Sequence, residues 1–162
     1  MKKILSGMLL AVLCMMLVTS CEKDMDSNPT FHENTTGFVL NMPANAANNI
    51  LDLLAADEIT FTTSQPDYGG IPLATNYDVE ISFEDFSSEN PVYKVVTSST
   101  STVIAISGSR LNDAVVNMFL EANEGVEYPS GEVKELYVRL HANVNGLDKG
   151  SCYSNVIKLQ VV

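Results

Sequence analysis

The residue with the clearest chemistry is Cys21, because of the residues that precede it. Two lysines follow the first methionine, residues 4–18 are almost wholly apolar, and Thr19 and Ser20 stand directly before the cysteine. A basic start, a short apolar stretch and small residues before a cleavage point are typical of a secretory signal peptide. The apolar stretch is shorter than the roughly 20 residues of a membrane-spanning helix. We therefore expect residues 1–20 to be removed.

Residues 18–21 also resemble the lipobox of bacterial lipoproteins, in which an apolar residue and two small ones precede a cysteine that receives diacylglycerol. The resemblance implies that lipid on Cys21 anchors the mature protein to a membrane. The alternative is a plain secretory signal that leaves Cys21 as an ordinary thiol.

The segment after Cys21 is acidic and offers almost nothing to bury. Such a composition keeps a chain solvated, so we expect residues 21–35 to form a flexible tether. An acidic run directly after the lipid-bearing cysteine also resembles the surface-export signal of Bacteroidetes lipoproteins. That resemblance implies exposure on the outer face of the outer membrane, and a linker with incidental charges is the alternative.

The charge of the mature chain narrows the classes of partner. Residues 1–20 contain two of the nine basic side chains and none of the twenty acidic ones, so cleavage leaves a formal charge of −13. Binding to nucleic acid or directly to anionic lipid requires a basic surface. We therefore expect neither. Cys152 is the one cysteine left besides Cys21, so no disulfide forms within the domain and Cys152 is interpreted as structural.

Seven segments have the pattern of β-strands. The clearest is 77–83, where four apolar residues alternate with three polar ones, as in a strand with one buried face. The others alternate in the same way or are rich in β-branched residues. They are residues 37–40, 58–63, 92–97, 102–107, 136–144 and 156–161.

After the predicted strand at residues 102–107 and before the one at 136–144, the spacing of the apolar residues changes. After Ser109, a suitable N-cap, apolar residues recur at three- and four-residue intervals as far as Ala122, which predicts a helix of about three turns. About seven strands with one short helix before the last two predict an all-β fold for residues 36–162. We expect an antiparallel β-sandwich of the immunoglobulin or fibronectin-III type, and an antiparallel barrel is the alternative.

Catalytic and metal-binding patterns have little support in the sequence. The two histidines, His32 and His141, fall in the predicted tether and on a strand face, and no His and Cys spacing is typical of zinc. Asp67, Asn76 and Asp78 carry oxygen atoms of the kind that bind Ca²⁺, although solvated turn residues look the same. We expect no enzyme activity, no cofactor and no metal.

Sugar binding requires a flat aromatic surface, and this chain has six tyrosines and no tryptophan. Tyr68 and Tyr128 fall in predicted loops, so they are the candidate ligand-binding residues. The alternative is that these tyrosines belong to turns and strand edges without a ligand.

Four segments resemble, in order, the N-terminal domain of SusE-type outer-membrane lipoproteins. They are residues 64–69 together with 75–82, then 106–114, 136–142 and 153–157, and they follow the lipobox. The resemblance implies a surface-exposed accessory or spacer in a Sus-like system that binds and takes up starch or another glycan. The implied partners are the glycan itself and outer-membrane glycan transporter subunits.

The resemblance covers the first domain of that family. The family's carbohydrate-binding domains lie nearer its C-terminus, and we expect them to be absent from this chain. A natural short protein and a truncated form of a longer one both remain open. The alternative function is a non-enzymatic adhesion or assembly module that binds another surface protein.

Overall fold

The computed structural model describes residues 31–32, 37–124, 126–147 and 149–162. Residues from Phe31 onward form one compact unit. The predicted signal peptide, Cys21 and most of the predicted tether lie outside the described residues.

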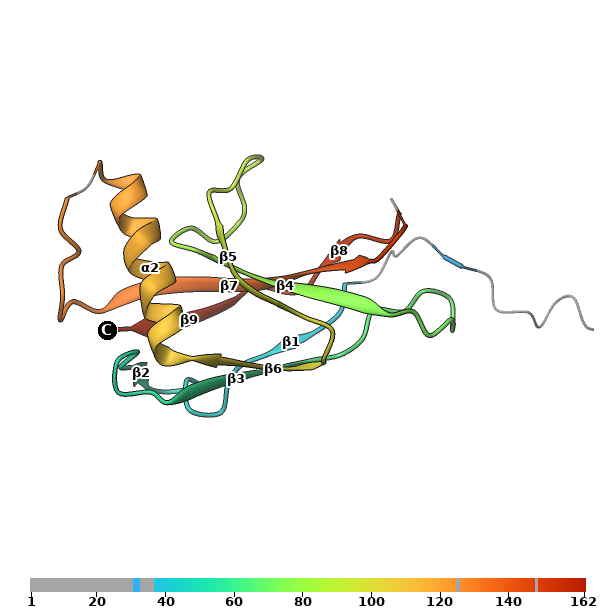
Figure 1. The fold of residues 1–162 in the computed structure, drawn as a ribbon, viewed down its shortest axis with the longest axis horizontal. Coiled ribbons are helices and arrows are strands. Elements are labelled where there is room, and N and C mark those ends of the chain that lie inside the picture. The colour runs from blue at the N-terminus through green and yellow to red at the C-terminus, as the bar shows by residue number, and fades with distance from the viewer. Residues whose placement is uncertain (1–30, 33–36, 125, 148) are drawn as a thin grey trace, which may run out of the picture. The chain divides into compact units, whose positions relative to one another are not determined.

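Within the described residues, nine strands form two sheets (Figure 1). The smaller sheet has the order β1-β3-β6, and its strands are β1 (Leu40–Asn41), β3 (Glu58–Thr63) and β6 (Val103–Ser107). The larger has the order β2-β9-β7-β4-β5, with β8 also paired to β7. Its strands are β2 (Ile50–Leu51), β4 (Thr75–Ser82), β5 (Lys94–Ser99), β7 (Lys134–Val144), β8 (Cys152–Tyr153) and β9 (Ile157–Val161). Only the pairing of β2 with β9 is parallel among those between described strands.

The alternation seen in the sequence is what builds the core between the two sheets. Ile59 and Phe61 of β3 are fully buried, as are Val79 and Ile81 of β4 and Leu140 of β7. Strands β9, β7 and β4 lie side by side, as the G, F and C strands do in immunoglobulin-type sandwiches. The predicted all-β sandwich is therefore confirmed.

Two strands were absent from the prediction, and one was displaced. β2 and β8 have two residues each, which is too short for an alternating pattern to be visible. The strand expected at 37–40 is observed only at Leu40–Asn41. The seven predicted strands thus correspond to the seven other elements, and the additional two extend the larger sheet.

The predicted helix is present as α2 (Gly108–Ala122), before β7. The proposed N-cap Ser109 was wrong, because Ser107 is the cap and its hydroxyl accepts a hydrogen bond from the Arg110 amide. A Cβ on Gly108 would collide with the backbone carbonyls of Leu53 and Ala56, so the helix starts at a residue without a side chain. α2 packs against β5 and β6, one strand from each sheet. The helix therefore closes one side of the sandwich.

Candidate functional site

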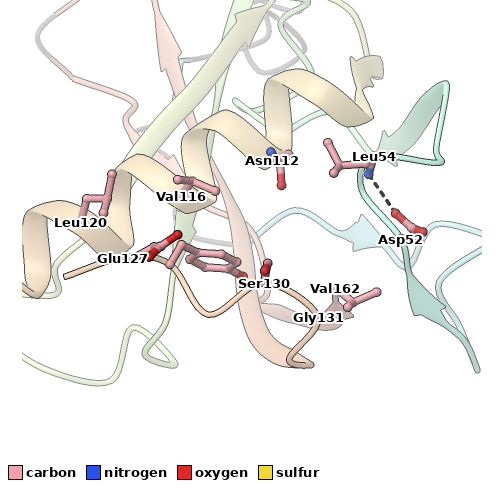
Figure 2. Close-up of a pocket in the computed structure, with 10 residues that line it drawn as sticks. Asp52, Leu54, Asn112, Val116, Leu120, Glu127, Ser130, Gly131 and Val162 are labelled. Atoms are coloured by element: carbon pink, nitrogen blue, oxygen red, sulfur yellow. Dashed lines mark hydrogen bonds between the residues drawn. The ribbon is translucent and has the colours of Figure 1, made fainter. Parts of the chain in front are cut away.

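A pocket of about 550 Å³ opens beside α2, and we call it the α2 pocket. Figure 2 shows side chains of the helix on one side and the 127–131 loop on the other, with Asp52 and Leu54 at one end. The volume falls within the roughly 300–1,000 Å³ typical of ligand sites. The elements around this pocket are far apart in the sequence, so the fold and not a local motif creates it.

The apolar wall of the α2 pocket comes from a second apolar stripe on the helix. Leu111, Val115 and Met118 face the core and are buried. Val116 and Leu120, one helical turn apart, are only half-buried and line the pocket together with Asn112. This second stripe was visible in the sequence as apolar residues beyond those that a core-facing stripe requires.

The rim of the α2 pocket is acidic. Among the described residues that line it, Asp52 and Glu127 carry negative charge and none is basic. Asp52 also fixes the turn beside it, since its carboxylate accepts hydrogen bonds from the amides of Leu54 and Ala55 at 3.0 Å each. That turn presents the Leu54 side chain, which is 77% exposed, at the pocket's edge.

Tyr128, one of the two candidate tyrosines, lines the α2 pocket. Its ring meets Phe119 edge-on with the centroids 5.2 Å apart, and it packs against the core. Burial raises the pKa of its hydroxyl above the ordinary value, ahead of a smaller lowering by Lys134. Tyr128 is thus partly buried and contributes a wall of the pocket instead of an open platform.

Tyr68, the other candidate, lies in a loop as predicted, but its ring is not exposed there. The side chain is fully buried and its hydroxyl donates a hydrogen bond to the Gly150 carbonyl at 3.0 Å. Phe31 stacks on the ring at 6.0 Å between centroids. Burial, the largest cause, raises the pKa of Tyr68 to about 12. Its ring has no open face of the kind that stacking on a sugar requires.

The loop around Tyr68 looked exposed because proline and glycine punctuate it. Asp67 instead folds it back, since its carboxylate accepts hydrogen bonds from the amides of Gly69 and Gly70 at 2.9 Å each. Gly150, with φ near +93°, lies so close that a Cβ would come within 3.3 Å of both the Phe31 and the Tyr68 rings. Long-range contacts of this kind leave no local signal.

A second group of charged and aromatic side chains lies on the outer face of the larger sheet, and we call it the Arg139 cluster. It consists of Asp78, Glu80, Phe86, Tyr93, Arg139, His141 and Tyr153. Glu80 and Arg139 are opposite each other on β4 and β7, and Arg139 Nε donates to the Glu80 carboxylate at 2.7 Å. The two side chains are 2% and 12% exposed. This is a nearly buried ion pair on a face that the alternation predicts to be solvated.

Aromatic rings cover the guanidinium of Arg139. The Phe86 and Tyr153 centroids lie 4.1 Å and 4.0 Å from its central carbon, and the Tyr93 centroid lies 5.7 Å away. Phe86 reaches this position with φ of 62°, which is a strained value for a residue with a side chain. Cation–π contact of this geometry stabilises the charge while keeping water away.

His141 and Asp78 extend the Arg139 cluster along the sheet. The His141 ring stacks on Tyr153 at 4.7 Å, and its Nδ1 lies 3.9 Å from the carboxylates of both Asp78 and Glu80. Asp78 also accepts hydrogen bonds from Asn76 and Asn143 at 3.1 Å each. Sequence reasoning missed the cluster, because Glu80 and Arg139 lie on different strands and only the register of β4 against β7 places them opposite each other.

The remaining candidate residues lie apart from one another. Of the three suggested calcium ligands, Asn76 donates a hydrogen bond to Asp78 at 3.1 Å, whereas the Asp67 carboxylate binds the Gly69 and Gly70 amides of its own loop, so the three do not share one site. Cys152 is buried, and burial raises the pKa of its thiol, which fits the structural interpretation. Cys21 lies outside the described residues. Across the described ranges, no helix has the length and apolarity needed to cross a membrane.

Comparison with known families gives one match that covers most of the chain. The model of the SusE outer membrane protein family matches residues 23–140, from just after Cys21 to the middle of β7. No solved structure matches the chain. The matched range contains most strands of the sandwich and the whole of α2. It also locates the protein at the outer membrane. The chain therefore belongs to the SusE outer membrane protein family.

Proposed function

We propose that this protein is a non-enzymatic accessory or spacer of a Sus-like system for binding and uptake of starch or another glycan. Lipid on Cys21 would hold it in the outer membrane, with the sandwich exposed at the cell surface. The family match supports the system, and the signal peptide, lipobox-like residues and acidic segment support the anchor.

The observation that carries the spacer role is the position of the two ends of the sandwich. Residues 31–32, the blue segment in Figure 1, lie at one end, and Val162 lies at the other. Phe31 packs on Tyr68, whereas the Val162 amide donates a hydrogen bond to the Leu51 carbonyl and the residue lines the α2 pocket. Residues 31–32, the first described residues of the domain, therefore lie at the end remote from this pocket.

The two candidate regions favour a spacer over a dedicated glycan-binding domain. Glycans are recognised by open aromatic faces together with polar groups that can reach their hydroxyls. Tyr68 is buried and Tyr128 lies edge-on within an apolar wall. In the Arg139 cluster, the Asp78 carboxylate and the Arg139 guanidinium are already engaged by neighbouring side chains.

The anchor is tested by replacing Cys21→Ser in the full-length chain in its native host. The unchanged protein should incorporate radiolabelled fatty acid, fractionate with outer membranes and be cleaved by protease added to intact cells. The Cys21→Ser variant should lose the label and leave the membrane fraction. Label that persists in this variant would exclude Cys21 as the lipid site.

The role in glycan uptake is tested by deleting the protein and measuring growth on starch and on other polysaccharides. Slower growth on at least one glycan, restored by the intact gene, is the expected result. Unchanged growth on every glycan, with adhesion proteins but no transporter subunits crosslinked to the protein, would favour an adhesion module instead. Native gels containing polysaccharide separate the two versions of the role, since retardation indicates direct binding and its absence indicates a spacer.

A further inference from the structure

The α2 pocket has a chemistry that selects a different kind of partner from a glycan. We propose that it docks an apolar segment flanked by lysine or arginine, supplied by another protein of the outer-membrane uptake system. The chemistry of this segment is inferred from the pocket alone, and its source in the uptake system rests on the proposed function.

The first argument is the apolar surface that the fold leaves uncovered at one place. Leu54 is 77% exposed at the edge of the α2 pocket, and Val116 and Leu120 form its half-buried wall. Water contact with such side chains is unfavourable, and an apolar group that enters the pocket removes it. Concave apolar surface beside a polar rim is typical of protein docking sites.

The second argument is charge complementarity. Asp52 and Glu127 stand at the rim, and none of the described lining residues offsets them. Three lysines elsewhere in the described residues are paired with carboxylates: Lys94 with Glu121 at 2.7 Å, Lys134 with Glu132 at 2.8 Å and Lys158 with Glu135 at 2.8 Å. A basic group next to the apolar anchor would therefore meet two carboxylates that have no cationic partner among the described lining residues, and the Tyr128 ring lies in the same wall.

The same features argue against two other occupants. A glycan would have to desolvate its hydroxyl groups against Val116, Leu120 and Leu54, which offer no hydrogen bonds from their side chains. A second copy of this chain in a symmetric contact would bring the same acidic rim against itself. Like charges placed together across an interface are unfavourable.

The place of the α2 pocket in the sandwich fits a docking role. It lies at the end that contains Val162, and residues 31–32 lie at the opposite end (Figure 1). A partner bound there would be separated from residues 31–32 by the length of the domain. In the proposed spacer role, the α2 pocket is thus the point at which the partner protein binds.

The test uses the mature chain carrying Cys21→Ser, which keeps every residue of the domain and avoids lipid and detergent. The probe is a fluorescein-labelled twelve-residue peptide of leucine and lysine, and fluorescence anisotropy measures its binding. Matched peptides of leucine and glutamate, and of serine and lysine, separate the apolar from the basic requirement. We expect saturable binding of the leucine–lysine peptide alone, weakened as the salt concentration rises.

Variants locate the bound peptide. Leu54→Ser should weaken binding about tenfold, whereas Val103→Ser, which changes a 55% exposed residue on β6, should not. Glu127→Lys should weaken binding by a similar factor, and Glu89→Lys, an equal charge change at an exposed residue outside the pocket, should have much less effect. Equal binding by Leu54→Ser and Val103→Ser, or no saturable binding, would overturn the proposal.

A photo-crosslinking residue introduced at Leu54 in living cells identifies the natural occupant. A crosslink to a transporter subunit through an apolar, lysine- or arginine-flanked segment supports the proposal. A crosslink to a second copy, or displacement of the peptide by polysaccharide, overturns it. A further outcome is that the purified protein binds the leucine–lysine peptide while deletion of its gene leaves growth on every glycan unchanged. That pair of results would support the chemistry of the pocket and reject only the proposed role in uptake.

Discussion

The Arg139 cluster and the α2 pocket differ in whether their charged and apolar side chains are bound by other residues of the protein. In the cluster, Arg139 and Glu80 bind each other at 2.7 Å and aromatic rings cover the guanidinium. In the pocket, Leu54 is exposed, and the carboxylates of Asp52 and Glu127 have no cationic partner among the described lining residues, although Asp52 accepts hydrogen bonds from two backbone amides. A group of charged residues in close contact is often a ligand-binding site, but in this cluster the charged groups bind other residues of the same protein.

The difference shows which region retains capacity for a ligand. A polar network whose members satisfy one another rigidifies the structure that contains it. Removal of one member leaves a buried charge without its partner, which destabilises the fold. Such a network therefore contributes mainly to stability. An apolar concavity with unpaired charges at its rim contributes little to folding and gains most from a partner. Stability and peptide binding, measured on variants of each region, should therefore respond differently.

The largest effect is expected from Arg139→Met. The change leaves the Glu80 carboxylate, which is 2% exposed, without its ionic partner, and breaking a buried pair costs about 3–5 kcal/mol. Urea denaturation of the Cys21→Ser chain measures the loss. The double variant Glu80→Met with Arg139→Met should recover much of it, because no charge stays buried. Binding of the leucine–lysine peptide to folded Arg139→Met protein should be unchanged, and a parallel loss of both would erase the distinction between the regions.

A second effect should appear at alkaline pH, where the two candidate tyrosines can be compared. Folding raises the pKa of Tyr68 from 10.0 to about 12, so its contribution is complete below pH 10 and is lost as the pH rises through 12. The linked loss is roughly 3 kcal/mol. Urea denaturation between pH 9 and pH 12 should show a shallower decline for Tyr68→Phe than for Tyr128→Phe. Equal slopes in the two variants would contradict the deeper burial of Tyr68.

The sequence predicted the parts of the structure that depend on local pattern. Alternation located β3, β4, β7 and β9, and helical spacing located α2, because each element buries one face of its own residues. The ends were less certain, since Gly108 begins the helix through a close approach to distant backbone.

The candidate sites were harder to predict, because they depend on contacts between distant segments. Tyr68 is covered by Phe31 and Gly150, which lie far from it in the chain. The α2 pocket needs the turn after β2, the helix and the loop after it to converge. Tyr128 was identified as a candidate and does line this pocket, although as a partly buried wall. The Glu80–Arg139 pair required the register of β4 against β7, which no single segment specifies.

A smaller effect on stability is expected at Phe86, where the relative stability of the alanine and glycine variants tests the backbone strain. Phe86→Ala removes the ring that lies 4.1 Å from the guanidinium while retaining a side chain at φ of 62°, so stability should fall by about 1 kcal/mol. Phe86→Gly loses the same ring but adopts this φ without strain. The glycine variant should therefore be the more stable of the two in urea denaturation. The reverse order would show that the left-handed backbone at this position carries no strain.

The smallest effect on stability is expected where the effect on binding is large. Leu54 is 77% exposed, so Leu54→Ser should change the free energy of unfolding by no more than about 0.5 kcal/mol. The same variant should weaken the leucine–lysine peptide about tenfold, because the leucine side chain is buried only when the pocket is filled. Arg139→Met should show the opposite pair of results. A large loss of stability in Leu54→Ser would mean that this side chain packs against the fold, and that the α2 pocket, like the Arg139 cluster, is occupied by the protein's own residues.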